Sequence, residues 1–70
     1  MKKLMDSADS ASVKKIFGDN LRRIRIQLRL RQRDLHLLTG IAHSLICETE
    51  KGVTNLTLET MVKLARAVKT

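Results

Sequence analysis

The side chains best suited to chemistry in this 70-residue sequence are concentrated in one short segment, TGIAHSLICETEKG, at residues 39–52. Gly40 and Gly52 bracket a stretch with the length of one short helix, since glycine commonly ends helices. A helical wheel gives this helix an exposed face with an imidazole, a hydroxyl, a thiol and a carboxylate. These groups belong to His43, Ser44, Cys47 and Glu48. All four can take part in hydrogen bonds.

Catalysis would need partners that the sequence does not supply. It has no paired carboxylates, no nucleophile with a neighbouring base and no glycine-rich phosphate loop. Cys47 is the single cysteine, so it can form no disulfide within the chain and has no second thiol to resolve an oxidised form. We therefore expect no enzymatic activity and no cofactor.

The charge of the sequence is strongly positive and unevenly placed. The formal net charge is +7, and eight of the 14 Lys and Arg residues lie between Lys14 and Arg33, where Asp19 is the only acid. Such a concentration indicates binding to nucleic acid or to an anionic membrane surface. Phe17 is the one aromatic residue, which argues against stacking on single-stranded bases. No apolar run approaches the roughly 18 residues that a transmembrane helix needs.

The elements that position these groups follow from the spacing of apolar residues. Residues 1–11 are polar and aperiodic, which predicts a flexible arm, and residues 12–70 are predicted to form one domain. Ser12 is a suitable N-cap for the first helix. The face of that helix predicted to be buried carries Phe17, Leu21, Ile24 and Leu28.

Three shorter helices are predicted after the first. One of about eight residues ends at Gly40, the next covers residues 42–51, and the last begins at Thr57, with Thr57 or Asn55 as its cap. The apolar residues predicted to face inward are Leu35 and Leu38, then Leu45 and Ile46, and finally Leu58, Met61, Leu64, Ala65 and Val68. Two short helices joined by about three residues that include glycine are typical of a helix-turn-helix.

An ordered set of residues extends this pattern to a family resemblance. The run from Phe17 to Val68 resembles the Cro/C1-type (XRE-like) helix-turn-helix family. The residues that carry the resemblance are Ile24 and Arg25 in the first helix, Leu30, Gln32 and Leu35 around the second, Gly40, Ile46, Glu50 and Gly52 around the third, and the closing segment NLTLETMVKLARAV. The resemblance implies a small all-α, lambda-repressor-like bundle of four helices, or five, that contains a helix-turn-helix.

The resemblance also implies roles for particular residues. The helix at residues 42–51 would lie in the major groove of a palindromic operator. Its chemistry and wheel predict base-reading by His43, Ser44, Leu45, Cys47 and Glu48. Phosphate contacts are expected from Arg31, Gln32, Arg33, Lys51 and Asn55, with Arg22 or Arg29 as further candidates. Arg25 and Glu50 would form a structural salt bridge. His36 would point inward in this register, so no metal site is expected.

Several positions depart from the family pattern. His36 and Thr49 are polar where the family is apolar, and we predict a hydrogen bond between them; the alternative is that His36 turns to solvent and Thr49 only fills space. Arg29 stands at a common glycine position, where a positive φ would cost about 1–2 kcal/mol. Ala42 replaces the usual Ser or Thr N-cap of the third helix, at a cost of roughly 0.5–2 kcal/mol.

These features predict a sequence-specific DNA-binding transcriptional regulator of repressor or controller type. We expect a homodimer, paired through the N-terminal arm or the exposed side of the last helix, in the cytoplasm of a bacterium, encoded by it or by a phage, and associated with the nucleoid. Two alternatives share the fold: an antitoxin that binds a toxin protein and regulates its own operon, and a protein-interaction module that has lost DNA binding. A third is a membrane-surface peptide built on the basic helix at residues 13–33, although its apolar face is needed for the core.

Overall fold

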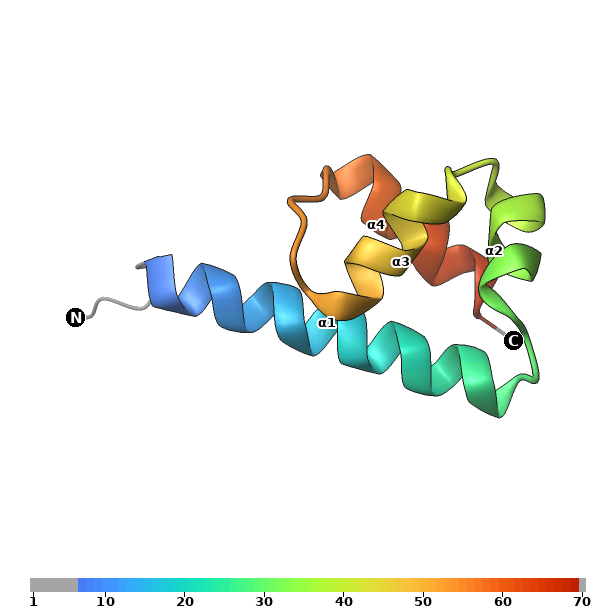
Figure 1. Ribbon diagram of the computed structural model, residues 1–70, viewed down its shortest axis with the longest axis horizontal. Coiled ribbons are helices and arrows are strands. Elements are labelled where there is room, and N and C mark those ends of the chain that lie inside the picture. The colour runs from blue at the N-terminus through green and yellow to red at the C-terminus, as the bar shows by residue number, and fades with distance from the viewer. Residues whose placement is uncertain (1–6, 70) are drawn as a thin grey trace.

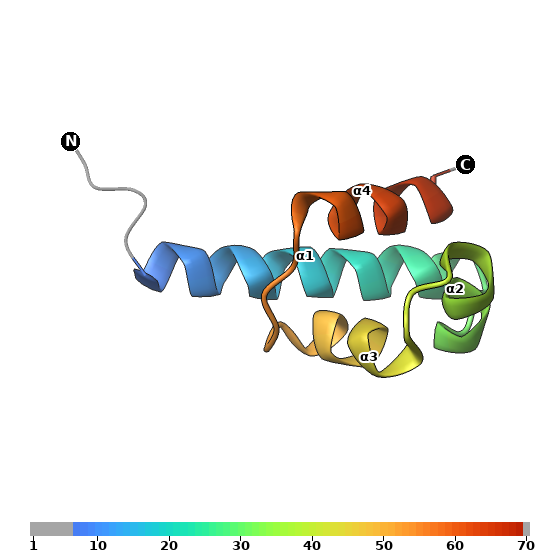
Figure 2. The same cartoon turned by 90° about the horizontal axis from the view of Figure 1, so that it is seen from above.

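The chain folds into four α-helices, as a computed structural model that describes residues 7–69 shows (Figure 1). They are α1 (Ser7–Gln27), α2 (Gln32–Thr39), α3 (His43–Lys51) and α4 (Leu58–Ala67). Viewed from above, α3 and α4 lie on opposite sides of the axis of α1 (Figure 2). The predicted all-α bundle with a helix-turn-helix, here α2 and α3, is confirmed.

The first helix begins earlier than its sequence suggested. It starts at Ser7, so the prediction that Ser12 caps it is wrong, and residues 7–11 of the predicted arm are helical. Alanine has the highest helix propensity, and the segment contains Ala8 and Ala11. Residues 1–6, the rest of the predicted arm, lie outside the described residues.

The turn after α1 has an unusual backbone conformation. Arg29 has φ 62°, and it is the only non-glycine residue with a positive φ in the described part of the chain. The amide N–H of Leu30 donates to the carbonyl of Arg25 at 3.0 Å, which closes the helix end around this left-handed residue. Arg29 therefore carries the backbone strain predicted for a positive φ at this position, about 1–2 kcal/mol.

Glycines set the ends of the two middle helices and the approach of α1 to α3. Gly40 ends α2 at φ 76° and Gly52 ends α3 at φ 75°, as predicted. Gly18 serves a different purpose, because a Cβ atom at this position would clash with the Thr49 carbonyl oxygen of α3. No pattern in the sequence predicts this role for Gly18.

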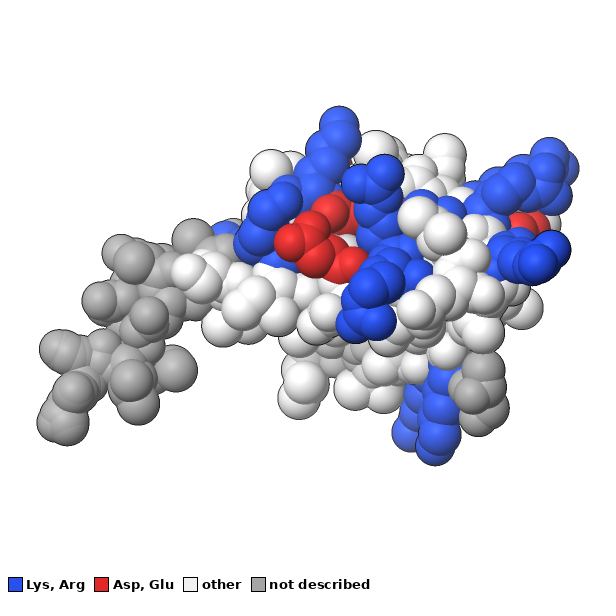
Figure 3. All heavy atoms as spheres, turned by 90° about the horizontal axis from the view of Figure 1, so that it is seen from below, with Lys and Arg blue, Asp and Glu red and all other residues white. Residues whose placement is uncertain are grey.

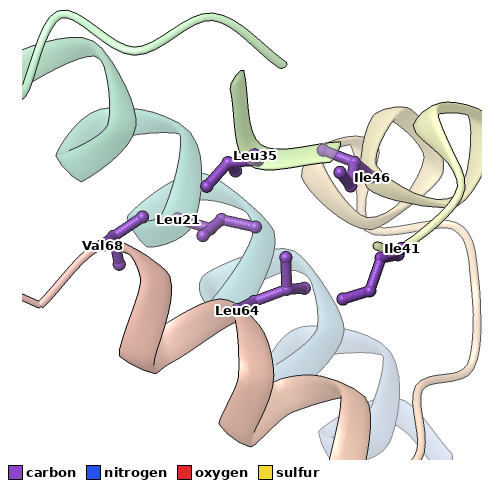
Figure 4. Close-up of a cluster of buried hydrophobic side chains, with 6 residues drawn as sticks. All are labelled: Leu21, Leu35, Ile41, Ile46, Leu64 and Val68. Carbon is purple, nitrogen blue, oxygen red and sulfur yellow. The ribbon is translucent and has the colours of Figure 1, made fainter. Parts of the chain in front are cut away.

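The core is small and collects one side chain from each helix, together with Ile41 from the turn between α2 and α3 and Val68 directly after α4. Figure 4 shows six of them directed toward one another. They are Leu21, Leu35, Ile41, Ile46, Leu64 and Val68. Phe17, Ile24 and Leu28 pack against this cluster, so the predicted face of α1 is confirmed.

Three residues predicted to face inward are exposed instead. Leu58, Ala65 and Leu38 lie on the surface. Leu64 and Val68 define the buried side of α4, and at about 100° per residue Ala65 and Leu58 fall about 100–120° away from Leu64. An α-helix in contact with a small core buries only a narrow stripe of side chains. The prediction assigned too many apolar residues to that stripe.

Candidate nucleic-acid interface

The outer face of α3 carries the polar side chains predicted from the sequence. His43, Ser44 and Glu48 are exposed, and Leu45 and Cys47 are partly buried at its edges. The opposite face carries Ile46, Thr49 and Glu50, all buried. The helix thus has one side fixed in the protein and one side free to meet a partner. Ala42 at its N-cap position makes no side-chain cap, as expected.

A hydrogen-bond network around Glu50 fixes the buried side of α3. Arg25 donates through Nε to Glu50 Oε2 at 2.6 Å and through Nη2 to Oε1 at 2.9 Å. Gln32 Nε2 donates to Glu50 Oε1 at 3.0 Å, and Arg25 Nη1 donates to the Leu30 carbonyl at 2.8 Å. The Arg25 and Glu50 side chains are only 11% and 4% exposed. A planar guanidinium suits such bidentate pairing with a carboxylate.

This network joins three helices at one carboxylate. Arg25 comes from α1, Gln32 from α2 and Glu50 from α3. The angle of α3 to the rest of the protein is therefore set by directed bonds as well as by apolar packing. The Arg25–Glu50 contact was expected, whereas the bonds from Gln32 and to the Leu30 carbonyl were not. Leu30 and Gln32 both carry the family resemblance, but only the three-dimensional arrangement brings the Leu30 carbonyl to Arg25 and the Gln32 amide to Glu50.

The hydrogen bond from Gln32 to Glu50 limits how Gln32 can make its predicted phosphate contact. Its side-chain nitrogen is already bonded to Glu50. Its backbone N–H lies in the first turn of α2, where helical N–H groups lack intrahelical partners and favour anions. We expect a phosphate contact from Gln32 to come from the backbone.

The start of α2 is stabilised by Asp34. Its carboxylate accepts a hydrogen bond from the backbone N–H of Arg31 at 2.7 Å and lies 3.5 Å from the Arg31 guanidinium. This backbone hydrogen bond, with a further contribution from the Arg31 charge, holds the pKa of Asp34 below its ordinary value. Arg31 and Arg33 both remain exposed on either side of Gln32.

The remaining predicted phosphate contacts lie at the other end of α3. Lys51 is in its last turn and Asn55 is in the loop that follows, and both are exposed. The predicted residues thus fall into two groups, one at the start of α2 and one after the end of α3.

The predicted hydrogen bond between His36 and Thr49 is absent. His36 Nδ1 lies 2.7 Å from the carbonyl oxygen of Ile41, and the Thr49 hydroxyl donates to the carbonyl of Leu45 at 2.7 Å. A carbonyl can only accept, so Nδ1 of His36 carries the proton. Threonine in a helix readily donates to the carbonyl four residues earlier. Each polar side chain thus bonds to a backbone carbonyl instead of to the other side chain.

The described residues 7–69 offer little to other kinds of site. They contain no group of three or more His, Cys, Asp or Glu side chains placed to hold a metal ion. Among the same residues, no helix has both the length and the apolar character needed to cross a membrane.

The exposed helix α3 follows α2 after a short turn that contains Gly40. Two short helices joined in this way form a helix-turn-helix domain. Residues 21–70 match the model of the family described as Helix-turn-helix, which comprises the Cro/C1-type, XRE-like domains. The chain belongs to this family, and its domain is a DNA-binding helix-turn-helix of the regulator kind. No curated protein and no solved structure matches the chain.

Proposed function

We propose that this protein is a sequence-specific transcriptional regulator that binds a palindromic operator as a homodimer, with α3 in the major groove. The observation that carries the proposal is the division of α3 into two faces. Arg25, Gln32 and Glu50 fix its inner face, while His43, Ser44 and Glu48 are exposed. An α-helix fits the major groove, which is about 12 Å wide.

The exposed side chains suit particular base edges. Glu48 would accept a hydrogen bond from a cytosine amino group, and His43 would donate to a guanine N7. Ser44 can donate or accept, Leu45 suits a thymine methyl group, and Cys47 would fill space beside them. The face lacks arginine, asparagine and glutamine, which make the strongest bidentate contacts to bases. Affinity would therefore depend strongly on phosphate contacts from Arg31, Gln32, Arg33, Lys51 and Asn55.

The outer face of α4 is a poor surface for the proposed dimer. Two copies on a palindrome must present both recognition helices to one side of the DNA. The outer face of α4 points away from α3 (Figure 2), so pairing through it would turn the recognition helices apart. We propose that the copies pair instead through the N-terminal part of α1, which projects beyond the other helices (Figure 1). Val13 and Ile16 are exposed there, at 53% and 58%.

The test is selection of bound duplexes from a random DNA library, followed by titrations across a salt series. We expect a palindrome whose half-sites lie about one helical turn, roughly 34 Å, apart. We also expect log Kobs to fall steeply with log salt, because each phosphate contact releases counterions. The variant Ser44→Ala with Glu48→Ala should lose the preference for the selected palindrome and keep binding to random duplex.

Other outcomes would point to other functions. Binding that depends on salt but selects no motif would reject sequence-specific regulation. Absence of any DNA binding would favour a protein-interaction module. Co-purification of a toxin protein from the source operon would favour the antitoxin role.

A further inference from the structure

The side of α1 that faces α3 carries a regular line of cations. Lys15, Gly18, Arg22 and Arg25 follow one another at alternating intervals of three and four residues, which places them along one side of α1. Gly18 approaches the backbone of α3, and Arg25 pairs with its Glu50. This line therefore runs beside α3.

Two of these residues, Lys15 and Arg22, are exposed, and so is Arg29 in the turn after α1. We call Lys15, Arg22 and Arg29 the α1 cation line. Seen from below, basic side chains gather over α1 around a small group of acidic side chains (Figure 3). At about 1.5 Å per helical residue, the line extends over about 20 Å. Arg29 stands in the turn that directly follows α1.

These three cations make few ion pairs or hydrogen bonds within the protein. Among the described side chains, those of residues 12–69, Arg22 and Arg29 make no ion pair and no side-chain hydrogen bond. Lys15 lies 3.5 Å from Asp19, and both side chains are more than half exposed, so this pair adds little stability. Arg29 also occupies a backbone conformation that an L-residue adopts only at a cost.

Because these cations lie beside α3, the phosphates of DNA bound by α3 are a suitable partner for them. A helix with its side chains is about 10–12 Å wide and fills the major groove, so the surfaces that flank it meet the phosphate backbones. Double-stranded DNA carries about one negative charge for each 1.7 Å of its axis. A single strand carries one charge for each 3.4 Å, so a line of about 20 Å beside one backbone faces about six phosphate charges.

We propose that Lys15, Arg22 and Arg29 form a second phosphate-binding surface that holds the DNA backbone beside α3. This inference rests on the proposed function for the position of the DNA. The surface lies on α1 and in the turn after it, and it adds to the contacts at the start of α2 and after α3. It gives affinity without sequence preference and so complements a recognition face that lacks the strongest base-reading residues.

The test uses the triple variant Lys15→Gln, Arg22→Gln and Arg29→Gln in the full chain. Its control is Lys63→Gln with Arg66→Gln, which removes two exposed cations from α4, next to the end of α2 and away from α1. Binding is measured from 50 to 200 mM salt, both to the selected operator and to a random duplex, and circular dichroism checks that each variant is folded.

For the triple variant we expect the slope of log Kobs against log salt to become shallower by about 2–3, since each phosphate contact contributes about 0.9. Operator and random duplex should lose the same factor in affinity. The control should keep the slope of the original chain.

A gain in affinity provides a second test that loss of folding cannot imitate. Asp19→Asn removes the acid beside Lys15 and should tighten binding to random duplex several-fold at low salt.

Unchanged slopes in a folded triple variant would overturn the inference and leave the proposed function standing. A loss confined to the operator would also overturn it, because the residues would then read sequence. If the triple variant loses only binding to phosphatidylserine vesicles, the line serves a membrane surface and the inference is wrong. If the original chain selects no motif but its salt slope still depends on the line, the inference holds and the proposed function fails.

Discussion

At the scale of single residues, Glu50 connects more of the molecule than any other side chain described above. Its two carboxylate oxygens accept three hydrogen bonds, two from Arg25 and one from Gln32. Replacement by alanine leaves the Arg25 guanidinium buried without its anion, which costs about 3–5 kcal/mol. That equals the whole stability expected of a domain this small, about 3–5 kcal/mol. We expect Glu50→Ala to be largely unfolded at 25 °C even without urea. Circular dichroism during a urea titration provides the measurement.

The double variant Arg25→Leu with Glu50→Leu is the control for this prediction. Replacing a buried ion pair with apolar residues of similar volume is often close to neutral. The double variant should therefore be more stable than Glu50→Ala. If both variants unfold at the same urea concentration, the stranded charge is not the cause of the loss.

Replacement of Arg29 by glycine should stabilise the protein. Its φ of 62° suits glycine better than arginine. Arg29→Gly should raise the free energy of unfolding by about 1 kcal/mol and the melting temperature by about 4–8 °C. Arg29→Lys keeps the backbone strain and should melt where the original chain does. An Arg29→Gly variant that melts at or below the original temperature would contradict the assigned strain.

Residue-scale contacts were only partly predictable from the sequence. The ion pair between Arg25 and Glu50 was expected because a motif fixes both positions. The contact between His36 and Thr49 was predicted wrongly, because each of them bonds to a backbone carbonyl, of Ile41 and of Leu45. Side-chain spacing alone does not show which carbonyls lie within reach.

At the scale of the helices, α3 and α4 differ in how they begin. Thr57 caps α4, since its hydroxyl accepts from the Thr60 N–H at 3.1 Å, whereas Ala42 offers α3 no side-chain acceptor. Ala42→Ser should stabilise the protein by roughly 0.5–2 kcal/mol, and Thr57→Ala should destabilise it by a similar amount. Thermal unfolding of the two variants checks both signs. Equal shifts in one direction would show that capping does not decide these effects.

The helix α2 should respond to pH through Asp34. The pKa of this carboxyl is lowered in the folded protein, chiefly by the hydrogen bond from the Arg31 N–H. Its stabilising effect is therefore complete above its unfolded pKa and is lost as the pH falls through the lower, folded value. Asp34→Asn should melt below the original chain at pH 7, and the difference should shrink below about pH 4. A difference that stays constant between pH 7 and pH 2 would contradict this account.

Helix ends were predictable where glycine sets them and less so elsewhere. Gly40 and Gly52 fixed the ends of α2 and α3, because a left-handed terminal residue favours glycine. The start of α1 was missed because Ser12 is a good cap, while the preceding Ser and Asp residues are also compatible with a helix. A good cap residue shows where a helix is able to begin, and the residues upstream decide whether it begins earlier.

At the scale of the whole molecule, the proposed dimer makes a prediction about α1. Val13→Lys with Ile16→Lys places charges on two exposed positions, so folding should be unaffected. We expect the variant to bind a single half-site as the original chain does or more tightly, and to bind the palindrome at least tenfold less cooperatively. Gel shifts that separate one bound copy from two provide the measurement.

The matched control adds the same charges to the outer face of α4. Leu58→Lys with Val62→Lys also changes exposed positions and should leave cooperativity on the palindrome unchanged. If the α4 variant loses cooperativity and the α1 variant keeps it, the copies pair through α4 and the proposed dimer is wrong.

The left-handed residue after α1 has a consequence for protein engineering. A screen that ranks variants of this chain by heat resistance alone would select glycine at position 29, since it relieves the backbone. If the α1 cation line binds phosphate, the same screen would discard one of its three charges. Selection for thermostability would thus enrich proteins that hold DNA less firmly, and a useful screen of this domain must score both properties together.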